Sequence, residues 1–372
     1  MSANIRPAGV FDTDYAQDMA INRTRFDRWL NNGLFLALLL LPLLTRAAPL
    51  GLDIISPAWI STINRIAILV IVVQGLNLLV GYTGQHSLGH AAFMAVGAYS
   101  AAIMSRELGT PFWLGVPLAA LLTGGVGLLF GLPSLRVKGF YLAMATLAAQ
   151  FIIPWLLRNP LAAWTNGTRP LEVPAPMLGS ISFASDGAIY YVIVPLAVLL
   201  MQAARNIIRT RTGRAFVAVR DNDLAAELMG INVFSYKLQA FFLSALYAGI
   251  AGALLAYERG SLSVDVFELD QSIQLLAMII IGGAGYPLGA LFGVTFITLL
   301  EENLIPAVAP SLRQSLPQLM PFVASVNIDA AIAPILFGLA LIVFLIFEPR
   351  GIAYRWEILK IAWKLRPYSY QR

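Results

Sequence analysis

Long apolar runs separated by short polar gaps fill most of the chain from about residue 30 to residue 347. Most runs are about 17 to 25 residues long, the length that a helix needs to cross the hydrocarbon core of a bilayer. A spanning helix satisfies its own backbone hydrogen bonds, so the pattern predicts an all-α fold, a polytopic transmembrane bundle. We expect about ten spans, at 30–48, 58–80, 88–106, 111–132, 139–158, 188–206, 235–257, 267–283, 285–306 and 330–347.

Composition supports the same fold class. Of the 372 residues, 58% are hydrophobic and 12% are charged, and the mean hydropathy is +0.74, whereas soluble domains carry roughly 25% charged residues. Cysteine is absent, which excludes disulfides, thiolate zinc sites and cysteine nucleophiles. We expect a cytoplasmic N-terminal segment (1–29), a transmembrane domain (30–348) with a cytoplasmic loop at 207–234, and a basic cytoplasmic tail (349–372).

Basic residues are divided unequally between the two sides of the predicted bundle. Ten spans place both termini on one side, which then holds eighteen of the 25 Lys and Arg residues. Six others fall on the opposite side, and Arg65 lies within a span. The positive-inside rule makes the richer side, with both termini, cytoplasmic. The net charge of +5 therefore reflects topology, and no nucleic-acid partner is expected.

Glycine-rich breaks interrupt two of the apolar runs, LNLLVGYTGQHSLGHAAF (76–93) and IIIGGAGYPLGALFG (279–293). We therefore expect broken or short helices near 81–90 and 282–286. Unwound backbone at membrane depth indicates a transport site, although helix packing through small residues explains the second break equally well. Polar side chains crowd the first break, which favours a translocation path there. The candidate path residues are Asn77, Gly81, Gln85, His86, Ser87, Gly89, His90 and Gly283.

The chain contains little that is suited to chemistry. It has no G-x-x-x-x-G-K-[ST] phosphate loop, so we expect no ATP site and no cofactor of its own. His86 and His90 are four residues apart but are the only histidines, which is too few for a metal site or for a membrane enzyme. Glu301 and Glu302 are expected in solvent at the outer end of a span, and Arg65 either snorkels or pairs within the bundle. We predict no catalytic residue.

A charged segment, GRAFVAVRDNDLAAELMGI (213–231), interrupts the apolar pattern on the cytoplasmic side. Asp221 or Asn222 can cap a short helix of about eight or nine residues, and Gly230 suits a left-handed C-terminal position. One face of this helix is apolar, formed by Leu224, Ala225, Leu228 and Met229. A helix this short and charged does not enter the bilayer. Its apolar face must be buried against the inner rim of the bundle or against a cytosolic partner.

The tail contains a second amphipathic pattern, between residues 351 and 366. Ile352, Trp356, Leu359 and Trp363 recur at helical spacing, with Lys360 and Lys364 beside them. We interpret the tail as an interfacial helix on the inner leaflet.

Three blocks resemble the permease subunits of branched-chain amino acid ABC importers: LNLLVGYTGQHSLGHAAFMAVGAYSAA (76–102), GLPSLRVKGFYLAMATLA (131–148) and GRAFVAVRDNDLAAELMGINVFSYKLQAFFLSALYAGIAGALLA (213–256). The ending FEPRGI (347–352) is similar to the family's close. The resemblance implies a second homologous permease subunit, two cytoplasmic ABC ATPase subunits that bind the ATP, and a periplasmic or extracellular solute-binding protein. It also implies a location in the bacterial inner membrane.

The resemblance further implies that the amphipathic segment is the coupling helix, which docks into a groove on the ATPase. Its residues are Asp221, Asn222, Leu224, Ala225, Glu227, Leu228, Met229 and Gly230. The implied cargo is a branched-chain or related amino acid. Urea, short amides and aromatic acids are the alternatives, because related permeases serve them and the separate binding protein selects the solute. A stand-alone secondary transporter and a second ATPase contact through the tail are further alternatives.

Overall fold

Helices make up most of the computed structural model, which describes residues 33, 38, 40–42, 57–134, 141–179, 181–307, 310 and 328–365. The predicted all-α membrane fold is confirmed, since the few strands are only two residues long. The N-terminal segment 1–29 and residues 366–372 of the tail lie outside the described residues, as does most of the first predicted span, 30–48.

The main helices are α3 (Pro57–Leu76), α4 (His90–Glu107), α5 (Phe112–Ser134), α6 (Tyr141–Arg158), α8 (Asp186–Arg209), α9 (Arg211–Asp221), α10 (Asp223–Leu228), α11 (Val233–Arg259), α12 (Leu269–Gly282), α13 (Gly289–Leu299), α15 (Ile328–Phe347) and α16 (Ile352–Leu365). The short helical elements are η2 (Asn77–Gly81), α7 (Ala162–Thr165), η3 (Val264–Phe267) and η4 (Leu300–Leu304). The strands are β1 (Leu171–Glu172), β2 (Met177–Leu178), β3 (Ile181–Ser182) and β4 (Ser261–Leu262), which pair antiparallel as β1 with β4 and β2 with β3.

Nine of the ten predicted spans coincide with described helices, and the other is the first span. Within the described residues, five helices are long and apolar enough to cross a membrane: Ala58–Gly81, Phe112–Leu132, Asp186–Arg209, Val233–Arg259 and Gly289–Ala307. A sixth results if Pro334–Phe347 and Ile352–Ala362, which meet at 43°, count as one bent span. The predicted spans 139–158 and 267–283 correspond to shorter apolar helices, Leu142–Arg158 and Leu269–Gly282.

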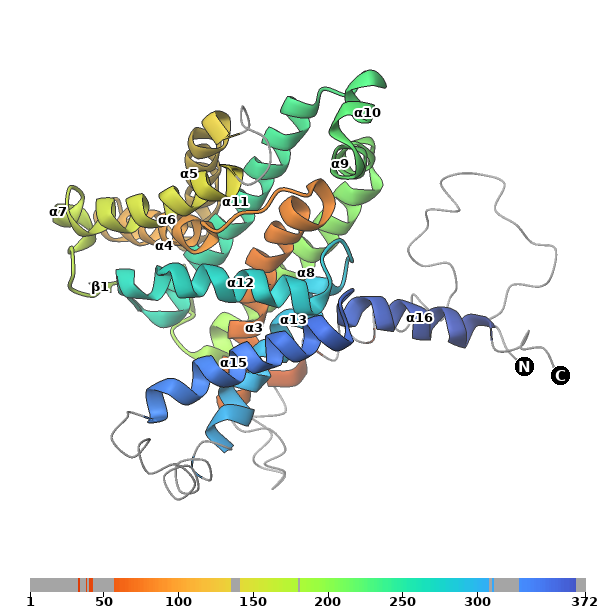
Figure 1. Ribbon diagram of the computed structural model, residues 1–372. Helices are drawn as coiled ribbons and strands as arrows, with labels where there is room; N and C mark the ends of the chain where they lie inside the picture. The colour runs from red at the N-terminus through yellow and green to blue at the C-terminus, as the bar shows by residue number, and fades with distance from the viewer. Residues whose placement is uncertain are drawn as a thin grey trace.

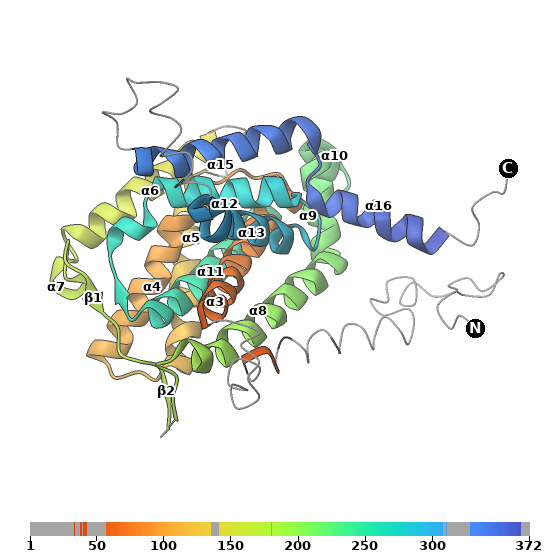
Figure 2. The same ribbon diagram turned by 90° about the horizontal axis from the view of Figure 1, so that it is seen from below.

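The core of the bundle forms around α3 and α11. The 27-residue α11 packs along α3, α4 and α5, while α8 and the α12–α13 pair pack against α3. Figures 1 and 2 show α3 surrounded by α8, α11, α12 and α13, with α15 and α16 at the periphery. Fully buried side chains such as Ile68 and Ile71 of α3, and Phe93 of α4 with Phe241 of α11, fill the space between these helices.

Small residues bring the backbones of neighbouring helices into direct contact. A Cβ atom added to Gly97 of α4 would lie 2.3 Å from the carbonyl oxygen of Gly249 of α11. Between α12 and α13, a Cβ on Gly293 would lie 1.7 Å from the carbonyl oxygen of Met278. Such close approach is typical of membrane helices, whose association depends on van der Waals packing. Packing therefore accounts for part of the glycine content near the second break.

We predict that Gly97→Ala destabilises the bundle, because the added methyl group meets backbone that has no rotamer to change. Overpacking of this kind costs about 1–3 kcal/mol. The matched control is Gly125→Ala in α5, where an added Cβ meets nothing within 4 Å. Heating purified protein in detergent and measuring the folded fraction by size-exclusion chromatography should give a lower midpoint for Gly97→Ala only. Equal midpoints for the two variants would contradict the assigned packing.

Candidate functional site

The first predicted break is present between α3 and α4. α3 ends in a π-helical turn, Asn77–Gly81, and the chain is non-helical from residue 84 to residue 89 before α4 begins at His90. Gly84 has φ +68°, a left-handed conformation that glycine adopts without steric cost. The sequence folds this way because a glycine-rich, polar stretch separates two apolar runs.

Polar side chains at the first break face one another in the interior. Ser87 Oγ lies 2.9 Å from His90 Nδ1, and His90 Nε2 lies 2.6 Å from Ser244 Oγ on α11. Gln85 Nε2 donates to Thr83 Oγ1 at 2.9 Å. All five of these residues are buried. Polar groups at membrane depth require such partners because the interior offers no bulk water.

The N-terminal end of α4 is held by side chains from two other helices. The amide N–H of Ala91 donates to Ser272 Oγ of α12 at 2.9 Å, and that of Ala92 donates to Gln150 Oε1 of α6 at 3.0 Å. Ser272 also donates to Gln150 at 2.8 Å. The first N–H groups of a helix lack intrahelical partners, and these side chains act as their acceptors. Sequence reasoning did not select Ser244, Gln150 or Ser272, although an isolated polar residue in an apolar span was the available signal.

The second break follows α12 and lies directly against the first. Asn77 in α3's π-turn donates from Nδ2 to the carbonyl oxygen of Tyr286 at 2.8 Å, and Asn77 Oδ1 accepts the N–H of Gly285 at 2.8 Å. A Cβ on Gly81 would lie 2.2 Å from the nitrogen of Gly285. One carboxamide therefore satisfies two backbone groups of the other break. The two breaks, predicted separately, form one junction.

Gly283 marks the turn at which α12 ends. It has φ +108°, and a Cβ placed on Gly351 would lie 2.4 Å from its Cα. The chain leading into α16 therefore packs against the second break, and Phe292 and Trp356 continue that contact with ring centroids 5.9 Å apart. Turn geometry and packing account for a glycine at position 283.

The candidate path residues thus gather at this junction. Seven of them are buried and His86 is exposed. Their part in translocation stays a prediction. The buried set consists of Asn77, Gly81, Gln85, Ser87, Gly89, His90 and Gly283.

The charged segment at residues 213–231 forms two helices, whereas we predicted one. Asp221 is the last residue of α9, so it does not cap α10; Asn222 does, by accepting the N–H of Ala225 at 3.0 Å. α10 spans only six residues, shorter than expected, and Gly230 follows it with φ +83°. The additional helix arises because the apolar residues before Asp221 also recur at helical spacing, and its Phe216 is fully buried.

The predicted apolar face of α10 is uncovered. Leu224, Leu228 and Met229 are 65%, 81% and 83% exposed, and Ala225 is exposed as well. Only Ala226 is buried within α10. We expected either the rim of the bundle or a partner protein to bury this face. The described part of the bundle does not bury it. Figure 1 shows α10 at an edge of the molecule, beside the start of α11.

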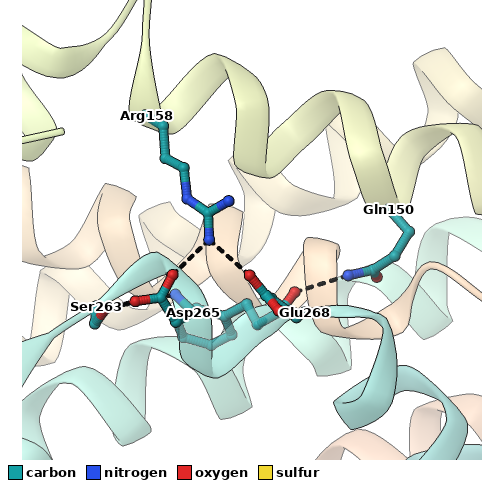
Figure 3. Close-up of polar contacts among 6 residues, drawn as sticks. Gln150, Arg158, Ser263, Asp265 and Glu268 are labelled. Atoms are coloured by element: carbon teal, nitrogen blue, oxygen red, sulfur yellow. Dashed lines mark hydrogen bonds and ion pairs between the residues drawn. The ribbon is translucent and has the colours of Figure 1, made fainter. Parts of the chain in front are cut away.

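Two charged clusters lie at or near the ends of spans that we predicted on the side opposite the cytoplasm. Arg158 at the end of α6 contacts Asp265 Oδ1 at 2.5 Å and Glu268 Oε1 at 2.8 Å, and Figure 3 shows its guanidinium between the two carboxylates. In the same view, Gln150 reaches the backbone carbonyl of Phe267 at 2.7 Å. These acids are more than half exposed, so the pairs contribute little to stability.

The second cluster corrects an expectation from the sequence. Glu301 and Glu302 are not free in solvent but face Arg65, whose guanidinium lies 3.9 Å from Glu301 and 3.0 Å from Glu302. Thr62 adds a hydrogen bond to Glu302. The acids lie on the π-helical turn η4, which packs beside α3, and Arg65 supplies the charge that makes partial burial tolerable. Arg65 therefore pairs within the bundle.

A bundle of long apolar helices with a polar junction inside it defines a polytopic membrane protein. Residues 59–345 match the family described as "Branched-chain amino acid transport system / permease component". The chain belongs to this family of ABC transporter permeases.

Individual relatives agree. The chain is 31% identical to the high-affinity branched-chain amino acid transport system permease protein LivM of Salmonella typhimurium, over 68% of this chain and 67% of the relative. LivM of Escherichia coli gives the same figures. The nucleoside ABC transporter permease protein NupC of Lactococcus lactis is 25% identical over 67% of this chain and 85% of its own length. No solved structure gives a significant match.

We predict that Asn77→Ala destabilises the protein by separating the two breaks. The variant leaves the partly buried N–H of Gly285 without its acceptor and removes one of two donors from the carbonyl of Tyr286, which also accepts the N–H of Gly289. A buried unsatisfied group costs about 1–3 kcal/mol. The control is Asn159→Ala, which removes an exposed amide that bonds only within its own turn. Thermal unfolding in detergent should show a lower midpoint for Asn77→Ala than for the control. An unchanged midpoint would mean that the junction carries little stability.

Proposed function

We propose that the chain is the translocation subunit of an inner-membrane ABC importer for branched-chain or related amino acids, with both termini in the cytoplasm. The observation that carries this proposal is the uncovered apolar face of α10, which requires a partner surface. The printed names of the LivM relatives favour amino acids as cargo. Because the chain is also similar to a nucleoside permease, other small polar solutes remain alternative cargoes. Urea, short amides and aromatic acids are alternatives as well.

The proposed assembly contains a second homologous permease, two ABC ATPases and a solute-binding protein. The ATPases bind the ATP, since the sequence has no phosphate loop of its own. The face of α10 docks into a groove on one ATPase by helix-in-groove recognition, with Leu224, Leu228 and Met229 as anchors. Glu227 is also exposed, so it lies at the rim of the contact. The chain makes and breaks no bond itself.

The junction of the two breaks is the proposed gate of the translocation path. Its side chains are neutral amides, hydroxyls and an imidazole, and they can exchange partners at low cost when helices move. Gln85 Oε1 is buried without a hydrogen-bond partner among the described residues, so it retains capacity to accept a hydrogen bond from a passing solute. Closure of the ATPases around nucleotide would move α10 and reopen these contacts.

We predict that Leu228→Arg prevents the ATPases from docking. The substitution buries an unpaired charge in the contact, which costs several kcal/mol, so ATPase that co-purifies with the chain should fall by about tenfold or more. Leu228→Met is the matched control, because it keeps an apolar side chain of similar size, and it should retain the ATPases. Undiminished co-purification and uptake with Leu228→Arg would show that α10 is not the docking element.

We predict that Gln85→Ala and Ser87→Ala alter solute uptake while leaving insertion and basal ATP hydrolysis intact. Losing one hydrogen bond to a polar solute changes uptake by about three- to tenfold. Uptake of radiolabelled leucine into proteoliposomes containing the whole importer measures the effect. Gln202→Ala, an exposed amide on α8, is the control and should match the unaltered importer. Unchanged uptake kinetics in both variants would show that the path does not run through this region.

A further inference from the structure

Arg220 connects the cytoplasmic helices to the first break. It lies in the last turn of α9, and its Nη1 donates to the carbonyl oxygen of Gly81 at 2.9 Å. Its Nε and Nη2 bind Asp221 Oδ1 at 3.1 and 3.0 Å, which fixes the plane of the guanidinium. The side chain is 38% exposed, so it reaches the junction from the surface. A residue beside α10 thus touches the backbone where α3 breaks.

Two glycines lie directly against the side chain of Arg220. A Cβ on Gly84 would lie 3.1 Å from Arg220 Cγ, and a Cβ on Gly285 would lie 3.2 Å from Arg220 Nη1. Gly84 belongs to the first break and Gly285 to the second. Asn77 joins the same Gly285 to the end of α3. The guanidinium therefore lies where both breaks meet, within contact distance of each.

The bond to Gly81 has a clear physical basis. The last carbonyl groups of a helix lack intrahelical partners and carry the negative end of the helix dipole. A guanidinium donor satisfies such a group with a charge-assisted hydrogen bond, which is stronger than a neutral one. Because Arg220 also binds Asp221, any displacement of the end of α9 must stretch this bond or carry Gly81 with it.

A second connection runs parallel to the first. Asp223 in the first turn of α10 forms an ion pair with Lys237 of α11, and the backbone carbonyl of Lys237 accepts a hydrogen bond from Gln85 Nε2 at 3.3 Å. α10 is therefore tied at its start to the same break that Arg220 contacts. The second connection reaches the break only through the neutral bond between Gln85 and Lys237, whereas the Arg220 bond is shorter and charge-assisted, so we take Arg220 as the dominant connection.

We propose that Arg220 is the positioning residue through which the α9–α10 pair acts on both helix breaks. The inference rests on the proposed function, because it assigns to docking at α10 a mechanical effect on the junction. When the ATPases close on nucleotide and displace α10, Arg220 transmits that displacement to Gly81 and, through Asn77 and Gly285, to the second break. Without Arg220 the ATPases still dock, but the junction no longer follows them.

The test measures movement of the break directly and does not depend on the cargo. The chain contains no cysteine, so His86→Cys places one exposed reporter thiol in the first break. The assembled importer carrying this reporter is treated with a fluorescent maleimide, without nucleotide and again trapped with MgATP and vanadate. The labelling rate of this subunit is read on a gel. We expect the two rates to differ by about tenfold in the otherwise unaltered chain, which corresponds to a free-energy difference of about 1.4 kcal/mol.

Adding Arg220→Ala should reduce that difference to less than about twofold while ATPase co-purification remains intact, because loss of one charge-assisted bond removes the link without touching the docking face. Arg211→Ala, an exposed arginine at the start of the same helix, is the matched control and should keep the full difference. If Arg220→Ala prevents assembly, Arg220→Lys repeats the test, since one ammonium group cannot reproduce the planar contact with both Gly81 and Asp221.

A nucleotide-dependent difference that persists in the Arg220 variants would overturn the inference, as would its absence from the unaltered chain. Failure of the proposed function looks different: ATPases that never co-purify with the unaltered chain, or that still dock on Leu228→Arg. Because docking and transmission are read by separate measurements, either can fail alone.

Discussion

The structure depends on one constraint: backbone groups freed at a helix break inside a membrane protein must find partners within the protein. Two breaks meet this requirement together. The carboxamide of Asn77 pairs with the N–H of Gly285 and the carbonyl of Tyr286, and Arg220 pairs with the carbonyl of Gly81. These contacts join the end of α9 to the end of α3, and the end of α3 to the turn that follows α12. Through Arg220, α9 therefore contacts Gly81, one of the residues of the proposed path.

Sequence periodicity predicted most of the fold because the properties involved are local. Span length, glycine-rich breaks, the cap at Asn222 and the left-handed Gly230 each depend on a few neighbouring residues. The contacts that build the site are not local. Asn77 and Gly285 are 208 residues apart, and no pattern within one run indicates that they meet. For the same reason the sequence did not decide whether Arg65 snorkels or pairs within the bundle. Glu301 and Glu302 were wrongly expected in solvent.

A polar interior at the proposed path would let one permease fold serve chemically different solutes. The junction offers hydroxyls, amides and one imidazole, and each of these groups can donate or accept hydrogen bonds. If the junction lines the path as proposed, these groups can contact an amino acid, an amide or a nucleoside without matching any of them closely. The chain is similar both to relatives named for amino acids and to one named for nucleosides, which agrees with that proposal. In the proposed assembly, discrimination between solutes belongs to the separate binding protein.

The glycine contacts between helices have a consequence for motion. Where Gly97 meets Gly249, and where Gly293 meets Met278, backbone touches backbone with no side chain that could switch rotamer. Each of these pairs, α4 with α11 and α12 with α13, is therefore expected to move as a rigid body. Flexing is then left to non-helical backbone outside these contacts, such as residues 84–89 between α3 and α4. The bundle is thus expected to move as stiff helix pairs about the unwound turn that precedes α4.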